Sequence, residues 1–374
     1  MQRTNGATLK IIYPFLCLTQ NERDKDATRT GKEERERKMR ATISTDRVSQ
    51  PMISVVLSFY NEEGVLSELI RRLRNVFRAE LEKKAIGSYE LIFVNDDSTD
   101  RSLEILLEES KKENDIVIIN MSRNFGVSEC VLAGMEYAKG DVVVYMDADL
   151  QDPPELIPKL IEEWGKNNDV EVVYTTRLSR AGEHPMKLFI TKWGYRFINA
   201  VSNIGLPVDS GDFKLLSRRA VNELLKLKEK KPYLRGLVSW IGFKQVPVFY
   251  HRERRYDSRK QTKFPVLSRR VIYGYLDRAL ISFSDVPLKA SLFLGFFVSL
   301  GALLYILVVI FQKIMGWYVP GWPAIMATML FLGGIQLFML GVFGLYINTI
   351  FLESKKRPNF IIKNIILPNQ RNQP

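Results

Sequence analysis

Two carboxylates, Asp147 and Asp149, stand two residues apart at the end of an apolar run. In an extended chain, residues i and i+2 point to the same side, so these two side chains share one face. Close carboxylates repel each other unless a cation lies between them. Oxygen ligands favour Mg²⁺ or Mn²⁺, and Mg²⁺ is commonly shared between a few carboxylates and substrate phosphates. Gln151 offers a third oxygen, so these three residues form the predicted metal site.

The elements that must position this site follow from the pattern of apolar residues. Five short apolar runs rich in β-branched residues are predicted strands: Ile53–Tyr60, Tyr89–Asn95, Ile116–Met121, Asp141–Met146 and Val170–Thr176. Four segments with helical spacing or helix-start signals lie between them: Asn61–Ala85, Asp100–Asn114, Gly126–Lys139 and Pro153–Lys166. This alternation predicts an α/β fold with βαβ units and a mostly parallel sheet. Since the strands are almost continuously apolar, we expect helices on both faces.

In such sheets, ligands bind outside the carboxyl ends of the strands. Polar residues gather at each of these predicted strand ends, in the segments 60–63, 95–100, 122–124 and 147–152 and at Arg177 and Arg180. Turn formation and helix capping explain single Asp and Ser residues there, but not five consecutive strand ends. The sequence has no glycine-rich phosphate loop, so we expect the metal and arginines to hold phosphates, with Arg123, Arg177 and Arg180 as candidates.

Composition narrows the class of partner and of metal site. The 374 residues carry a net charge of +12, which suits phosphorylated substrates, an anionic lipid surface or nucleic acid. Only two cysteines and two histidines are present, which excludes a disulfide framework and argues against a cysteine- or histidine-rich metal site. A reducing, cytosolic setting is the natural interpretation.

Two long apolar runs near the C-terminus, Ala290–Phe311 and Ala324–Phe351, are each long enough to cross a bilayer, which takes about 20 residues. Basic residues flank the pair on both outer sides, so the positive-inside rule places both flanks in the cytoplasm. The preceding segment 266–284 is either a helix on the membrane surface or an ordinary amphipathic core helix. The predicted plan is therefore a disordered or partly helical tail (1–50), a catalytic domain (51–264), a juxtamembrane amphipathic helix (265–286), a transmembrane hairpin (287–352) and a cytoplasmic tail (353–374).

Several motifs resemble those of one enzyme family. The segments are SFYNEE (58–63), NDDSTD (95–100), SRNFG (122–126), MDADLQDPPE (146–155), DSGDFKLLSR (209–218), YLRGLVSWIGF (233–243) and QTKFP (261–265). They are similar to those of family 2 glycosyltransferases with the GT-A fold. The most similar branch is the polyisoprenyl-phosphate glycosyltransferases, which include dolichol-phosphate mannose synthases and bacterial bactoprenol glucosyltransferases. The resemblance covers roughly residues 52–355, and the Gln-x-x-Arg-Trp motif of processive synthases is absent.

The resemblance implies roles for individual residues. Residues for the nucleotide donor would be Tyr60, Glu62, Asp96, Ser98 and Arg123, the first three at the base and ribose. Asp147, Asp149 and Gln151 would bind the metal and, through it, the diphosphate. Phosphate contacts and the acceptor side would fall to Arg177, Asp212 and Lys263. Relatives usually have a glycine three residues before that lysine, where this chain has Lys260.

The implied activity is inverting transfer of a hexose from a nucleotide sugar to a polyisoprenyl phosphate. The expected donor is UDP-glucose, with GDP-mannose as the alternative, and the expected place is the cytoplasmic face of the inner membrane. No nucleic-acid partner is expected, and self-association is left open. Competing interpretations are a non-catalytic membrane scaffold, a transport component and a glycosyltransferase with a soluble acceptor. Two apolar spans without internal ionisable residues give a single chain no transport pathway.

Overall fold

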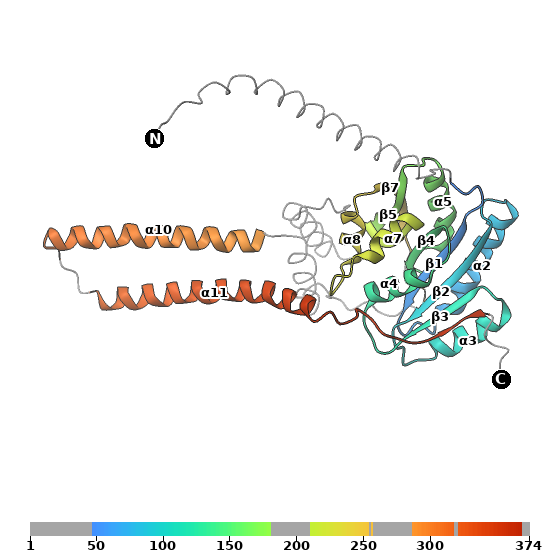
Figure 1. Cartoon of the computed structure of the whole chain (residues 1–374), viewed down its shortest axis with the longest axis horizontal. Helices are drawn as coiled ribbons and strands as arrows, with labels where there is room; N and C mark the ends of the chain where they lie inside the picture. Colours follow the sequence, from blue (N-terminus) through green and yellow to red (C-terminus); the bar gives the residue numbers. More distant parts are fainter. Residues whose placement is uncertain (1–46, 181–209, 254–255, 257–285, 318–320, 369–374) are drawn as a thin grey trace, which may run out of the picture. The chain divides into compact units, whose positions relative to one another are not determined.

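The structure is a computed structural model that describes residues 47–180, 210–253, 256, 286–317 and 321–368. One mixed sheet runs through it in the order β7-β5-β6-β4-β1-β2-β3-β8 (Figure 1). The strands are β1 (Met52–Phe59), β2 (Ser88–Asn95), β3 (Ile116–Met121), β4 (Val142–Asp147), β5 (Val170–Arg180), β6 (Ser210–Ser217), β7 (Lys244–Arg252) and β8 (Ile362–Ile366). All five predicted strands are therefore confirmed, and β5 is longer than expected.

The helices also follow the predicted order. They are α2 (Leu66–Glu82), α3 (Ser102–Lys112), α4 (Val127–Tyr137), the 3-10 turn η1 (Pro154–Leu156), α5 (Ile157–Gly165), α7 (Arg218–Lys226), α8 (Leu234–Trp240), α10 (Val286–Ile314) and α11 (Trp322–Ser354). Two prolines, Pro154 and Pro158, stand near the starts of η1 and α5, where a missing N–H costs little. The four predicted segments correspond to α2, α3, α4 and η1 with α5.

Strand directions divide the sheet into a parallel part and a mixed part. β1 pairs in parallel with both β2 and β4, and β2 pairs in parallel with β3. β6 runs antiparallel between β4 and β5, while β7 is parallel to β5. The predicted mostly parallel α/β sheet is confirmed. The antiparallel strand β8 is an addition to the prediction, which gave residues 353–374 no strand.

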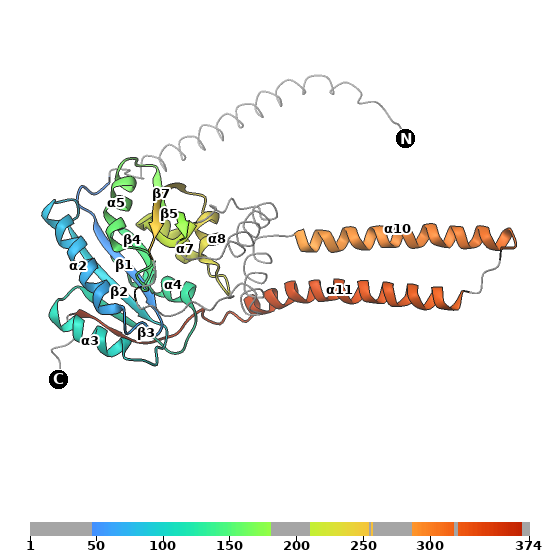
Figure 2. The ribbon, with the colours of Figure 1, turned by 180° about the vertical axis from the view of Figure 1, so that it is seen from behind.

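Helices cover both faces of the sheet, as the apolar strands predicted. On one face, buried side chains of α2, α3 and α5 pack against alternate residues of β1 and β2, such as Leu57 and Phe93. On the other face, α4, α7 and α8 pack against the intervening residues, such as Val56 and Ile92. Figure 2 shows the same elements from behind. Apolar side chains of β1 therefore enter two different cores, one on each face of the sheet.

Two helices are long and apolar enough to cross a membrane. α10 and α11 have 29 and 33 residues, and large side chains such as Phe297 and Leu337 are exposed along them. A helix with apolar side chains exposed all round is suited to lipid rather than to water. The predicted spans Ala290–Phe311 and Ala324–Phe351 lie inside these helices. The expected N-terminal tail, as far as residue 46, and the juxtamembrane segment 266–284 lie outside the described residues.

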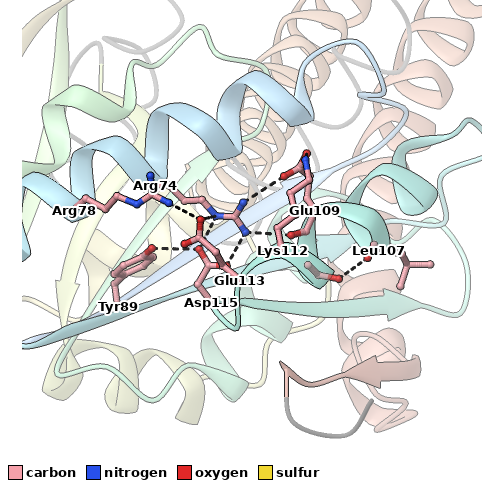
Figure 3. A network of polar contacts seen from close by, with 9 residues as sticks. Arg74, Arg78, Tyr89, Leu107, Glu109, Lys112, Glu113 and Asp115 are labelled. Atoms are coloured by element: carbon pink, nitrogen blue, oxygen red, sulfur yellow. Dashed lines mark hydrogen bonds and ion pairs between the residues drawn. The ribbon is translucent and has the colours of Figure 1, made fainter. Parts of the chain in front are cut away.

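A buried ion-pair network ties α2 to the loop before β3 (Figure 3). Arg74, whose side chain is 7% exposed, donates to both oxygens of Asp115 at 2.9 and 2.8 Å and to Glu109 at 3.3 Å. Tyr89 donates to the same Asp115 carboxylate at 3.2 Å. The more exposed Arg78 contacts Glu113 at 2.5 Å. This network fixes α2 against α3 and so supports the strand ends that both helices follow.

Replacing Arg74 with methionine should lower the free energy of unfolding by about 3 kcal/mol, because it strands the Asp115 charge in a buried site. The measurement is urea denaturation of the detergent-solubilised full chain, followed by tryptophan fluorescence. Arg78→Met is the matched control and should stay within about 1 kcal/mol of the parent chain, since its ion pair is largely exposed. Equal effects of the two substitutions would contradict this account.

Candidate functional site

The turns after β1 and β2 are cross-linked by the side chain of Asn61. Its amide oxygen accepts from the backbone N–H of Thr99 at 2.8 Å and of Asp100 at 3.3 Å. Its own backbone N–H donates to Ser98 Oγ at 3.0 Å. Asn61 and Asp97 have positive φ angles of 58° and 62°, a region that asparagine and aspartate tolerate better than most residues. The two turns therefore form one edge, with the Tyr60 ring beside it, 47% exposed.

Asp96 links this edge to the loop after β3. Its buried carboxylate accepts from the backbone N–H of Phe125 at 2.7 Å and of Gly126 at 3.0 Å. Gly126 has a φ angle of 110°, which favours glycine, and it precedes α4. In the same loop, the Arg123 guanidinium lies 4.0 Å from the centre of the Phe125 ring. Asp96 therefore holds the loop that presents Arg123.

The end of β4 lies beside the end of β1. Asp147 is the last residue of β4 and pairs with Ser58, two residues before Tyr60. Asp149 follows in a turn in which its Oδ1 accepts from the Gln151 backbone N–H at 3.0 Å. Leu150, between them, has a φ angle of 55°, which costs a non-glycine residue energy. Because chain order reverses around β1, this edge is the switch point at which α/β sheets bind ligands.

Asp147 is surrounded by other carboxylates. Burial, followed by the charges of Asp212, Asp149 and Asp152, raises the pKa of Asp147 to about 8. No group of three or more His, Cys, Asp or Glu side chains within residues 47–180, 210–253 and the later described ranges is arranged to hold a metal alone. A cation shared with substrate phosphates needs only a few protein oxygens, and it would relieve this repulsion. The Asp147 and Asp149 carboxylates therefore fit Mg²⁺ or Mn²⁺, and Gln151, 6% exposed, stays a predicted ligand.

Arg177 points toward a second buried carboxylate, that of Asp152. Its Nη2 lies 3.8 Å from the Asp152 carboxylate, and its Nε donates to Tyr250 Oη at 3.3 Å. Tyr250 in turn donates to Asp152, and Arg252 Nε lies 3.4 Å from the same carboxylate. Gly211 leaves room for this arrangement, because a Cβ there would lie 3.1 Å from Arg177 Nη2. Asp152 thus holds the guanidinium groups of Arg177 and Arg252 at the edge next to Asp149.

Asp212 is held by a two-pronged ion pair with Arg235. Arg235 Nε donates to Asp212 Oδ1 at 2.6 Å, and its Nη2 donates to the other carboxylate oxygen. Burial alone would raise the pKa of Asp212, but the charge and hydrogen bonds of Arg235 outweigh it and lower that pKa. Because β6 runs antiparallel to β4, the start of β6 meets the end of β4. Asp212 thereby reaches the Asp147 cluster from a different strand.

Lys214, two residues after Asp212 on β6, is fully buried. Its Nζ has no hydrogen-bond partner among the residues that the structure describes. Burial lowers the pKa of Lys214 to about 8, against the raising effect of Asp212. The cluster therefore balances four carboxylates against four basic groups: Asp147, Asp149, Asp152 and Asp212 with Arg177, Lys214, Arg235 and Arg252.

The structure thus arranges the predicted residues in two adjoining groups. Tyr60, Asp96 and Ser98 belong to the β1–β2 edge, where the Glu62 backbone N–H also donates to Ser102 Oγ at 2.8 Å. The second group contains Asp147, Asp149, Arg177 and Asp212, while Lys263 lies outside the described residues. Sequence reasoning missed Asp152, Tyr250, Lys214 and Arg235 as site residues. In the sequence, these residues stand within the quoted motifs or at strand ends. That position alone does not show which side chains they contact.

Comparisons with known proteins identify the family of this chain. The model of Glycosyl transferase family 2 matches residues 54–225. The uncharacterized glycosyltransferase YkcC of Bacillus subtilis is 41% identical over 320 residues, which span 85% of this chain and 95% of that protein. A prophage bactoprenol glucosyl transferase homolog of Escherichia coli is 33% identical, over 84% of this chain and 99% of that protein. The bactoprenol glucosyl transferase of Shigella phage SfV is also 33% identical, over 83% and 98%. The chain therefore belongs to glycosyl transferase family 2.

Proposed function

We propose that this glycosyltransferase transfers a hexose from a nucleotide sugar, UDP-glucose as the first donor, to a polyisoprenyl phosphate. The observation that carries the proposal is the buried cluster in which Asp147 and Asp149 adjoin Arg177 and Arg235 at the switch point of the sheet. Such a cluster suits a reaction between two phosphate-bearing molecules. Relatives named bactoprenol glucosyl transferases, at 33% identity, support a lipid-linked phosphate as the acceptor.

The acceptor supplies its own nucleophile. A phosphate monoester has a second pKa of about 6, so at neutral pH it is mostly a dianion and needs no general base. Its oxygen attacks the anomeric carbon of the donor sugar, and the bond from that carbon to the UDP oxygen breaks. UDP leaves with the electron pair, and one displacement inverts the configuration. The enzyme must therefore bring two anions together and stabilise the departing diphosphate.

Each group of site residues has a distinct task in this scheme. Tyr60, Glu62 and Asp96 hold the base and ribose. Ser98 also belongs to the donor site, and Arg123 lies close to the donor phosphates. Asp147, Asp149 and Gln151 hold Mg²⁺ or Mn²⁺, which when bound neutralises charge on the leaving diphosphate. Arg177 and Lys263 attract phosphate. Asp212 lies on the acceptor side, where Arg235 keeps its carboxylate ionised and oriented.

The apolar helices explain how a lipid acceptor reaches this site. We infer that α10 and α11 cross the inner membrane and that the catalytic domain is cytoplasmic. Basic residues flank the pair on both outer sides, which favours this orientation. Nucleotide sugars are cytosolic, so donor and active site share a compartment. The acceptor tail stays in the bilayer while its phosphate lies at the surface.

Membranes that contain the chain should move radiolabel from UDP-glucose into the organic extract when undecaprenyl phosphate is added. A parallel reaction with GDP-mannose tests the alternative donor. Membranes without the chain are the control. Label found only in water-soluble products would overturn the lipid acceptor, and label from neither donor in any product would favour a non-catalytic scaffold.

Asp147→Asn and Asp149→Asn should each lower kcat by at least about 100-fold, because a neutral amide neither balances the nearby cations nor binds Mg²⁺ as a carboxylate does. Initial rates of transfer by the purified variants at saturating Mn²⁺ are the measurement. Asp169→Asn changes an exposed carboxylate outside the cluster and should leave the rate unaltered. Near-normal turnover by either variant would refute the metal assignment.

Arg235→Gln should lower kcat by about 10-fold or more, because it leaves the Asp212 charge facing Asp147 without its partner. The double variant Asp212→Asn/Arg235→Gln should lose much less than the sum of the two single effects. A double-mutant cycle on kcat measures this, with an expected interaction of at least about 1 kcal/mol. Additive effects would show that the two side chains act independently in turnover.

A further inference from the structure

The strand that follows the second apolar helix belongs to the sheet of the catalytic domain. β8 pairs antiparallel with β3, with Ile118 opposite Ile366 and Asn120 opposite Asn364. The backbone N–H of Ser122 also donates to the Ile361 carbonyl at 2.9 Å. Figure 1 shows this segment lying along β3 at the edge of the sheet. The chain beyond α11 therefore returns to the sheet beside β3, the neighbour of β2.

Three asparagines lie abreast on β2, β3 and β8. Asn95 is opposite Asn120, and Asn120 is opposite Asn364. The Asn95 amide group donates to Asn120 Oδ1 at 3.0 Å, and the Asn120 amide group donates to Asn364 Oδ1 at 3.0 Å. Asn95 and Asn120 are only 4% and 6% exposed, so the bond between them is buried, and the bond from Asn120 to Asn364 is partly buried. Buried amides stay paired because an unpaired donor is costly.

Asn95, at one end of this row of amides, closes the turn 96–100 that follows β2. Asn95 Oδ1 accepts from the Ser98 backbone N–H at 2.9 Å, across the turn in which Asp97 has a positive φ angle. Ser98 Oγ in turn accepts from the Asn61 backbone N–H at 3.0 Å. Each carboxamide has one oxygen and one NH₂ group, so the direction of one sets the direction of the next. An acceptor at Asn364 therefore holds Asn95 with its oxygen toward Ser98.

We propose that Asn364 is a positioning residue for the nucleotide donor, acting through Asn120 and Asn95 on the turn 96–100. The proposal rests on the proposed function, in which Asp96 and Ser98 belong to the donor site. Asn364 itself is exposed and lies two strands away from that turn, so it does not touch the donor. Its contribution is to preorganise the turn before the nucleotide binds.

A purely structural role for β8 predicts a different result. If the strand only covers the edge of β3, its backbone pairing suffices and the identity of residue 364 is unimportant. The discriminating substitution keeps the backbone and the shape of the side chain but removes the acceptor. Asn364→Leu does so and also shields the Asn120 amide from water. Asn364→Asp restores an acceptor of the same shape, and Lys363→Leu is the control on the neighbouring position.

The experiment measures UDP binding to the purified full chain by calorimetry in Mn²⁺ buffer, together with KM and kcat for transfer. Asn364→Leu should weaken UDP binding and raise the donor KM by about 3- to 10-fold, the size expected for one lost hydrogen bond, with kcat within about twofold. Asn364→Asp should return both values to within about twofold of the parent chain. Lys363→Leu should bind UDP as the parent chain does.

Unchanged UDP affinity in Asn364→Leu would overturn the inference, as would an Asn364→Asp variant that binds no better than Asn364→Leu. A fall in melting temperature without a change in affinity would also overturn it, in favour of simple edge cover. If the parent chain bound neither UDP nor GDP, the proposed function would fail, and this inference with it. Weakened binding that the aspartate rescues supports both.

Discussion

Like charges crowded at the carboxyl end of β4 are the constraint on which the rest of the site depends. Asp147 lies among Asp149, Asp152 and Asp212, and burial together with these like charges raises its pKa. Basic groups from the mixed half of the sheet offset the repulsion between these carboxylates. β5, β6, β7 and α8 bring Arg177, Lys214, Arg252 and Arg235 to the same place. Because β6 runs antiparallel to β4, the start of β6, with Asp212 and Lys214, lies beside the end of β4.

The donor edge is organised by a different kind of force. There, hydrogen bonds between turns, such as those of Asn61 with Thr99 and Asp100, fix the backbone. Such bonds depend little on salt, whereas partly exposed ion pairs are screened by it. The site thus combines an edge held by hydrogen bonds between turns with a charged cluster that a cation and phosphates would complete. Preorganisation at both edges limits the ordering that substrates must induce.

The sequence was sufficient for the parallel half of the fold and for the first members of the site. Apolar runs and helical spacing predicted β1 to β5 with their helices, and strand ends pointed to Asp147 and Asp149. β6 was not predicted because Asp212 and Lys214 place charges on its buried face. The segment therefore lacks the continuous apolar run that predicted the other buried strands. The partners of Asp152 were also hidden, since Tyr250 stands 98 positions away and only the fold joins them. The short β8 lies in the largely apolar stretch 360–367, but no local pattern indicates that it pairs with β3.

The pairing of β8 with β3 also has a consequence for biosynthesis. Asn120 and Asn364 are 244 positions apart, and both apolar helices are made between them. While the ribosome synthesises those helices, β3 is an open edge on a nascent chain, the kind of edge that invites wrong pairing. The sheet is completed only when β8 emerges, after both apolar helices have been synthesised. The pairing of β3 with β8 therefore depends on the order of translation. It forms late and, as a contact between residues far apart in the sequence, it forms slowly.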